Sequence, residues 1–202
     1  MTQLGRFTGL ARDGLAVADD VVRQMLAGAD YANPTGLYRC NMARLNATAD
    51  TGALTTQVMT SVALFLRKGD VVTNLTFRSG ATAAGTPTNY WFALYSSAAT
   101  PALLAQTADQ LTAAWAANTT RTLALASPVT IPADGIYWAA VMVKATTVPT
   151  LVGQSPLASA PLLAGAGEKT LAQTSGAALT TTAPATIASP AVAATVPLVL
   201  AS

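Results

Sequence analysis

The side chains that could perform acid–base chemistry in this chain are few and stand apart. The sequence has no His, one Cys and nine acidic residues. Without His, a Ser-His-Asp triad, a Cys-His pair and a His-based metal site are excluded. Asp19 and Asp20 fall on an expected helix, whereas Asp70, Asp109 and Asp134 fall in expected turns, where carboxylates commonly accept backbone hydrogen bonds. We therefore predict no catalytic residue, no cofactor and no metal site.

One glycine-containing string comes near a phosphate-binding motif. Residues 165–170 read GAGEKT, but Glu168 separates the last Gly from Lys169. A P-loop ends in Gly-Lys-Ser/Thr and follows a strand, and neither condition is met here. The string SGATAAGTP, residues 79–87, also lacks the required order. We predict no phosphate cradle in either segment.

The aromatic residues offer the other candidate site. Tyr90, Trp91, Trp115, Tyr137 and Trp138 could form a stacking platform for a sugar. Alternation along the two aromatic segments would turn about half of these rings inward, as core residues. An exposed ring would more often lie at a subunit contact. We therefore keep the three Trp residues as candidate ligand or subunit contacts.

Composition favours a folded, weakly charged protein. Hydrophobic residues make up 51% of the 202 residues, which is enough for a full domain core. Charged residues make up only 10%, against roughly 25% in typical soluble domains. The net charge is +2 and the only adjacent basic pair is Arg67-Lys68, so the clustered cations of a nucleic-acid surface are missing. A surface rich in Thr, Ser and Ala suits a protein packed among many copies.

Cysteine and targeting signals add little. Cys40 is alone, so it cannot form an intrachain disulfide, and it is expected to be a buried or half-buried small side chain. The first 14 residues lack the apolar stretch of a secretory signal. No segment offers about 18 consecutive apolar residues, so we predict no membrane partner.

Residues 1–36 are expected to be an N-terminal arm with one short helix, Asp13 to Ala27. Asp13 can cap its start and Gly28 can end it. An apolar stripe follows helical spacing, made by Leu15, Val21, Val22, Met25 and Leu26. One amphipathic helix cannot bury itself, so it must pack on the central domain or on a neighbouring subunit. The sequence leaves both possibilities open.

Residues 37–153 are expected to form an all-β domain. Short apolar segments alternate with turn signals, at residues 37–45, 58–67, 71–79, 90–95, 102–106, 120–126 and 136–144. In residues 71–79, alternation places Val71, Thr73, Leu75 and Phe77 on one face. In the fourth and last of these segments, odd and even positions also separate into two faces; Tyr137, Ala139, Val141 and Val143 share one of them. Strands of this length and spacing predict an antiparallel β-sandwich or jelly roll.

Residues 154–202 differ in composition. They are dominated by Ala, Thr, Pro, Ser and Gly, contain only Glu168 and Lys169 as charged residues, and have no aromatic residue. Such a chain is usually a linker or tail, although residues 195–200 have the pattern of a strand. We expect an extended C-terminal arm that becomes ordered by lying on neighbouring subunits.

Several strings within the central segment resemble a β-sandwich module of virion proteins from tailed bacteriophages, particularly those that infect actinobacteria. They are GDVVTNLTF, NYWFALY, AQTADQ, WAANT and DGIYWAAVMV, and the resemblance spans roughly residues 62–153, under half of the chain. Such modules occur in minor tail and head-decoration proteins. The resemblance carries no catalytic motif, and it does not cover the flanking arms.

The expected function is therefore that of a non-enzymatic virion protein, an exterior capsid decoration or a tail-appendage component. It would dock through its arms onto major capsid or tail subunits and self-associate, with a homotrimer as the expected oligomer. The alternative is a receptor-binding module that holds host surface glycan through Trp91, Trp115 or Trp138. A glycan hydrolase would need two carboxylates about 5–10 Å apart across a cleft, and no spacing here suggests such a pair.

Overall fold

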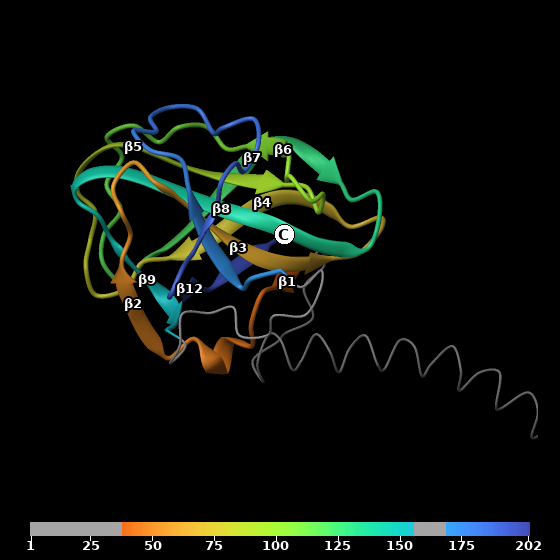
Figure 1. Ribbon diagram of the computed structural model, residues 1–202. Coiled ribbons are helices and arrows are strands. Elements are labelled where there is room, and N and C mark those ends of the chain that lie inside the picture. The colour runs from red at the N-terminus through yellow and green to blue at the C-terminus, as the bar shows by residue number, and fades with distance from the viewer. Residues whose placement is uncertain (1–37, 156–168) are drawn as a thin grey trace, which may run out of the picture.

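A computed structural model describes residues 38–155 and 169–202 of the chain (Figure 1). Within these ranges the protein is almost entirely β, with one short 3-10 helix, η1 (Arg44–Asn46). The strands are β1 (Arg39–Cys40), β2 (Ala49–Ala53), β3 (Met59–Leu66), β4 (Val71–Arg78), β5 (Gly85–Tyr95), β6 (Leu103–Gln106), β7 (Thr120–Thr130), β8 (Gly135–Thr147), β9 (Thr150–Gln154), β10 (Ala172–Ser175), β11 (Ala191–Val192), β12 (Val196–Pro197) and β13 (Val199–Ala201).

The strands form three sheets in which neighbouring strands pair antiparallel. The largest sheet has the order β11-β10-β3-β8-β5-β6, and the second has the order β1-β13-β4-β7. A third sheet consists of β12-β9-β2. The prediction of an all-β fold with antiparallel sheets is thus confirmed.

Strand β8 lies at the centre of the six-stranded sheet and has both faces buried. It pairs with β3 on one side and β5 on the other, and residues 137–143 are all buried. Tyr137, Ala139, Val141 and Val143 belong to one hydrophobic cluster, as the alternation predicted. Trp138, Ala140 and Met142 belong to a second cluster on the opposite face. Alternation along these strands therefore separates two cores and does not separate core from solvent.

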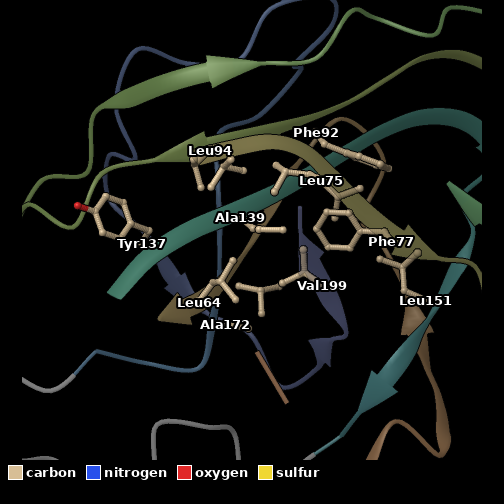
Figure 2. Close-up of a cluster of buried hydrophobic side chains, with 14 of the residues drawn as sticks. Leu64, Leu75, Phe77, Phe92, Leu94, Tyr137, Ala139, Leu151, Ala172 and Val199 are labelled. Carbon is tan, nitrogen blue, oxygen red and sulfur yellow. The ribbon is translucent and has the colours of Figure 1, made fainter. Parts of the chain in front are cut away.

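The first cluster, here the inner cluster, joins the two larger sheets (Figure 2). Leu75 and Phe77 of the four-stranded sheet meet Phe92 and Leu94 of β5 there, and Val199 of β13 lies in the same cluster. The Phe77 and Phe92 ring centroids are 4.8 Å apart. Branched and aromatic side chains at alternate positions give each sheet one continuous apolar face, and burying these faces together stabilises the fold.

Two expected strands differ in detail. In residues 71–79 the sequence pattern placed Val71 on the same face as Leu75 and Phe77. The pairing of β4 with β7 shifts register between Val72 and Asn74, which is a β-bulge or irregularity, and Val72 is buried while Val71 is exposed. The register shift exchanges the buried and exposed positions of β4 on either side of it. The expected strand over residues 37–45 shrinks to β1, because the chain turns into η1 after Asn41.

The prediction that residues 154–202 form an arm lying on neighbours is wrong for residues 169–202. Strand β10 pairs with β3, β12 pairs with β9, and β13 lies between β1 and β4. Val199 and Ala201 are fully buried, and Figure 1 shows the chain end among the earlier strands. Val199 and Ala201 of β13 add apolar side chains to the buried face of the four-stranded sheet. The folded domain therefore extends to Ser202. The expected strand over residues 195–200 appears as β12 and β13.

The expected domain boundary at Gly153 is in fact a strand contact. Gly153 pairs with Pro197 of β12, and a Cβ atom at this position would collide with the carbonyl oxygen of Val196. Glycine is therefore required for the close approach of the two backbones. The predicted helix over residues 13–27 lies outside the described residues, as does the rest of residues 1–37. In the described ranges, no helix is long and apolar enough to span a membrane.

Candidate functional site

The three Trp residues that sequence analysis singled out are all buried. The exposed fractions are 0% for Trp91, 0% for Trp115 and 3% for Trp138. A sugar-stacking platform needs an exposed ring face, and a subunit contact needs an exposed ring. The structure therefore offers neither at these residues, and the glycan-binding alternative loses the platform on which it depended.

Trp115 belongs to the inner cluster. Its ring centroid lies 5.5 Å from that of Tyr90 and 5.7 Å from that of Phe92. Its indole Nε1 donates to the carbonyl oxygen of Thr119 at 3.3 Å. Edge and tilted ring contacts of this kind add to the stabilisation from burial. Trp115 thus fixes the 107–119 loop against the sheet.

Trp91 and Tyr95 lie on the opposite, outer face of the six-stranded sheet and hold a covering segment, residues 176–190, against it. Trp91 Nε1 donates to the carbonyl oxygen of Thr180 at 2.7 Å, and Tyr95 Oη donates to that of Pro184 at 2.9 Å. Burial raises the pKa of the Tyr95 phenol. The covering segment is bound to the sheet by side-chain donors and by Ala183 and Ile187, which join the outer cluster.

A pocket of about 740 Å³ opens on this outer face, beside the covering segment. Its walls come from residues 97–101, from the end of the covering segment at residues 187–190, from Lys169, Thr170 and Gln173, and from Trp138. Segments that are distant in sequence meet here because β10 lies beside β3 and the chain returns from the β6 edge to β11. Ile187 N donates to Pro101 O at 2.9 Å and fixes one corner.

Polar groups without partners gather on this face. Trp138 Nε1 and Ser61 Oγ are buried and have no hydrogen-bond partner among the described residues. Ser61 pairs in register with Gln173 and Ala140, so its side chain lies on the same face as the outer cluster. An unpartnered buried donor costs about 1–3 kcal/mol, so such groups call for an explanation.

Among the residues that the structure describes, Lys169 is the one charged residue in the wall of the pocket. Its Nζ donates to the carbonyl oxygens of Ser97 at 2.6 Å and Ala98 at 3.4 Å. Partial burial lowers the pKa of the ammonium group, because desolvation disfavours its charged form. No carboxylate forms an ion pair with it in the described ranges; the ion pair found there joins Arg39 and Asp70.

Next to the pocket the same face carries an outer apolar patch, formed by Phe65, Leu171 and Val192. These side chains are 48%, 49% and 44% exposed. Phe65 follows the alternation of β3 from Met59 of the outer cluster, and Leu171 O accepts from Ala63 N of that strand. Val192 pairs in register with Gln173. The three side chains thus come from β3, from the residue before β10 and from β11, which are neighbouring segments of the sheet.

A smaller pocket of about 260 Å³ lies on the four-stranded sheet, near Cys40, Arg44 and Arg78. Cys40 is buried, as expected, and burial raises the pKa of its thiol to about 11. The thiolate needed for nucleophilic attack or metal binding is therefore disfavoured at neutral pH.

The carboxylates expected in turns all accept backbone hydrogen bonds, but among the described residues a donor nearby in sequence is found for Asp70 and for Asp109, which accepts from Leu111 N at 3.2 Å, and not for Asp134. Asp70 accepts from Arg67 N at 2.9 Å, Asp109 from Tyr90 N at 3.0 Å and Asp134 from Lys68 N at 2.7 Å. Asp70 also pairs with Arg39 through two bonds of 2.9 Å, which ties β1 to the turn before β4. Within residues 38–155 and 169–202, no group of three His, Cys, Asp or Glu side chains could hold a metal ion. Asp19 and Asp20 lie outside the described residues.

Sequence reasoning missed the pocket residues. Lys169 was considered only as part of a near match to a P-loop, and Gln173 was assigned to an arm. The available signal was that Lys169 is the last cation of the chain, within a segment almost free of charge. Its partners, Ser97 O and Ala98 O, lie more than 70 residues earlier and could not be identified from spacing.

No protein-family model matches the chain, and no curated protein matches it significantly. The functional conclusion therefore depends on the chain's own residues.

Proposed function

We propose that the chain is a non-enzymatic structural protein of a tailed-phage virion, an exterior capsid decoration or a tail-appendage component. The two larger sheets meeting in one inner cluster support the finer assignment of the fold as a β-sandwich or jelly roll. The resemblance of residues 62–153 to the phage module supports the virion assignment. The expected partners are further copies of the chain, as a homotrimer, and major capsid or tail subunits.

The observation that carries the proposal is the outer apolar patch. Large apolar side chains exposed together on neighbouring strands mark protein contact sites more often than isolated ones do. Phe65 and Leu171 are each about half exposed, although ample Ala and Thr positions exist on the same surface. Burying them between copies would supply association energy from apolar area.

This placement changes how the protein would dock. Residues 169–202 are part of the sheets, so they are not a free C-terminal arm. The outer apolar patch, and not a C-terminal arm, is therefore the proposed contact between copies. The N-terminal segment, residues 1–36, is retained in the proposal as the second contact, toward capsid or tail subunits.

Self-association is tested by light scattering after size exclusion at several protein concentrations. The native chain is expected to be a trimer, and the double variant Phe65→Ser/Leu171→Ser is expected to be a monomer with unchanged circular dichroism. Leu111→Ser is the matched control, because Leu111 is 55% exposed but lies in the loop between β6 and β7. A native chain that stays monomeric at high concentration would overturn the proposed self-association.

Virion location is tested by immunogold electron microscopy of purified phage particles with an antibody against the chain. Labelling is expected on the capsid exterior or on the tail, in many copies per particle. A chain found only in the lysate, with no labelled particle and no affinity for purified capsid or tail subunits, would contradict the proposal.

A further inference from the structure

The pocket beside the covering segment has a charge that the described residues do not neutralise. Lys169 lies in its wall, and no Asp or Glu is among the lining residues. Carbonyl oxygens of Ser97 and Ala98 orient the ammonium group, yet they carry no formal charge. An ammonium group has three N–H donors, so the two carbonyls leave one for a further acceptor. An anionic acceptor forms the strongest bond with it.

Lys169 is also partly buried, and this desolvation lowers the pKa of its side chain. The ammonium group loses hydration without gaining a counter-charge from the residues that the structure describes. A carboxylate that entered the pocket would restore the missing interaction, and reduced solvent screening would strengthen it.

The remaining walls combine apolar and hydrogen-bonding surfaces. Pro190 and Ala188 provide exposed apolar surface, Thr170 and Ser189 provide hydroxyl groups, and the buried Ile187, Pro101 and Gln173 form the floor. Trp138, whose indole N–H has no acceptor among the described residues, also lines the pocket. A pyranose ring presents the complementary pair of surfaces, a C–H face and a rim of hydroxyls.

The size of the pocket agrees with a ligand of this kind. Its volume of about 740 Å³ lies within the range of roughly 300–1,000 Å³ typical of small-molecule sites. This space suits one or two sugar units and is larger than a simple inorganic anion needs.

We propose that this pocket binds an acidic saccharide unit, whose carboxylate is held by Lys169 Nζ and whose hydroxyls are held by Thr170 and Ser189, with the ring against the exposed Pro190. The site is distinct from the Trp platform considered from sequence, because the Trp138 ring is covered and lies behind the exposed wall residues. The inference does not depend on self-association or on a virion location.

The experiment follows the three indole N–H signals of the 15N-labelled full chain by NMR while glucuronate is titrated. The Trp138 signal, assigned with Trp138→Phe, is expected to shift saturably. The signals of Trp91 and Trp115 are expected to stay, because their N–H groups already donate to Thr180 O and Thr119 O. Glucose, acetate and inorganic phosphate are titrated in parallel and are expected to bind at least about tenfold more weakly.

Variants test the residue assignment. Lys169→Gln is expected to weaken glucuronate binding by about tenfold or more, and Lys169→Arg to retain part of it. Lys144→Gln is the matched control, since Lys144 lies at the far end of β8 and outside the pocket. Ala99→Trp places bulk at an exposed position of the wall and is expected to block binding without affecting the fold.

Three results would overturn the inference. They are the absence of any Trp138 shift with glucuronate, equal binding by Lys169→Gln, and equal binding of glucose or of inorganic phosphate. The titration is repeated on the Phe65→Ser/Leu171→Ser variant, whose expected monomeric state separates loss of the pocket from burial in an oligomer. If the Phe65→Ser/Leu171→Ser variant binds glucuronate saturably and adding Lys169→Gln abolishes this binding, the pocket is supported as the binding site. This result holds even if the native chain never self-associates.

Discussion

Each face of the six-stranded sheet carries a buried cluster, but the two clusters are covered in different ways. The inner face meets a second sheet, and rings such as Phe77 and Phe92 pack directly against each other. The outer face meets residues 176–190, which contain no charged and no aromatic residue. There, donors such as Trp91 Nε1 and Tyr95 Oη bind carbonyl oxygens of the covering segment.

The difference follows from side-chain size. Large side chains on two facing sheets fill the space between them and bury much apolar area. A segment of Ala, Thr and Pro buries little area per residue, so hydrogen bonds to its backbone must place it. Where the segment turns back near Pro190, small side chains leave the pocket unfilled. The inner face thus contributes most of the stabilising burial, whereas the outer face leaves a pocket open to ligands.

The largest expected effect concerns the C-terminal strand on the inner side. Val199→Asp would bury an unpaired carboxylate in the inner cluster and is expected to cost roughly 4 kcal/mol or more of unfolding free energy. Val71→Asp makes the same change at a 44% exposed position of β4, outside the outer apolar patch, and is expected to cost about 1 kcal/mol or less. Urea denaturation followed by circular dichroism measures both. Equal, small effects would mean that residues 196–201 do not belong to the core.

The next effect compares the packing of the inner face with that of the outer face. Phe92→Ala removes a fully buried ring that contacts Phe77 and Trp115, and it is expected to cost about 3–5 kcal/mol. Thermal and urea unfolding measure the loss. If Phe92→Ala cost less unfolding free energy than Trp91→Phe or Trp138→Phe on the outer face, the inner face would not be the more stabilising one.

Two Trp residues on the outer face test the role of the covering segment. Trp91→Phe loses the bond to Thr180 O as well as volume, and is expected to cost about 1–3 kcal/mol. Trp138→Phe loses a similar volume, but its indole N–H has no acceptor among the described residues, so its cost is expected to be smaller by about 1 kcal/mol. The two variants are compared by urea unfolding under identical conditions. A larger cost for Trp138→Phe would show that its indole has a partner in solution.

The smallest effect is the pH dependence from Tyr95. Burial raises the pKa of this phenol in the folded state, so the neutral form is favoured by folding. Its contribution is fully present below the unfolded-state pKa, about 10, and is lost as pH rises toward the folded-state value. By pH 11 the native chain is expected to lose about 1 kcal/mol relative to Tyr95→Phe. Stability curves from pH 8 to 11 measure this difference, and parallel curves would contradict it.

Sequence patterns were sufficient for the strands of the central segment because each strand has its own alternation and is bounded by turns. The faces of β8 were assigned correctly, since Tyr137, Ala139, Val141 and Val143 share one cluster. The same reasoning failed for residues 169–202, where Ala and Thr give a weak pattern. It also failed for the Trp residues, because alternation cannot tell a solvent face from a second core.

The candidate pocket could not be predicted at all. Its cation, Lys169, and the carbonyls that orient it come from segments about 70 residues apart, and only the pairing of β10 with β3 brings them together. The exposure of Phe65 and Leu171 could not be predicted either, because large apolar side chains are usually buried.

By itself, the sequence determined the β class of this protein, the approximate positions of its central strands and the lack of His-based chemistry, since these depend on residue types and short-range periodicity. Only the tertiary structure decided which faces are covered, that the C-terminal residues complete the sheets, and where a charged pocket and an apolar patch remain. Those outcomes depend on long-range strand pairing, because it determines which distant segments become neighbours and which side chains stay uncovered.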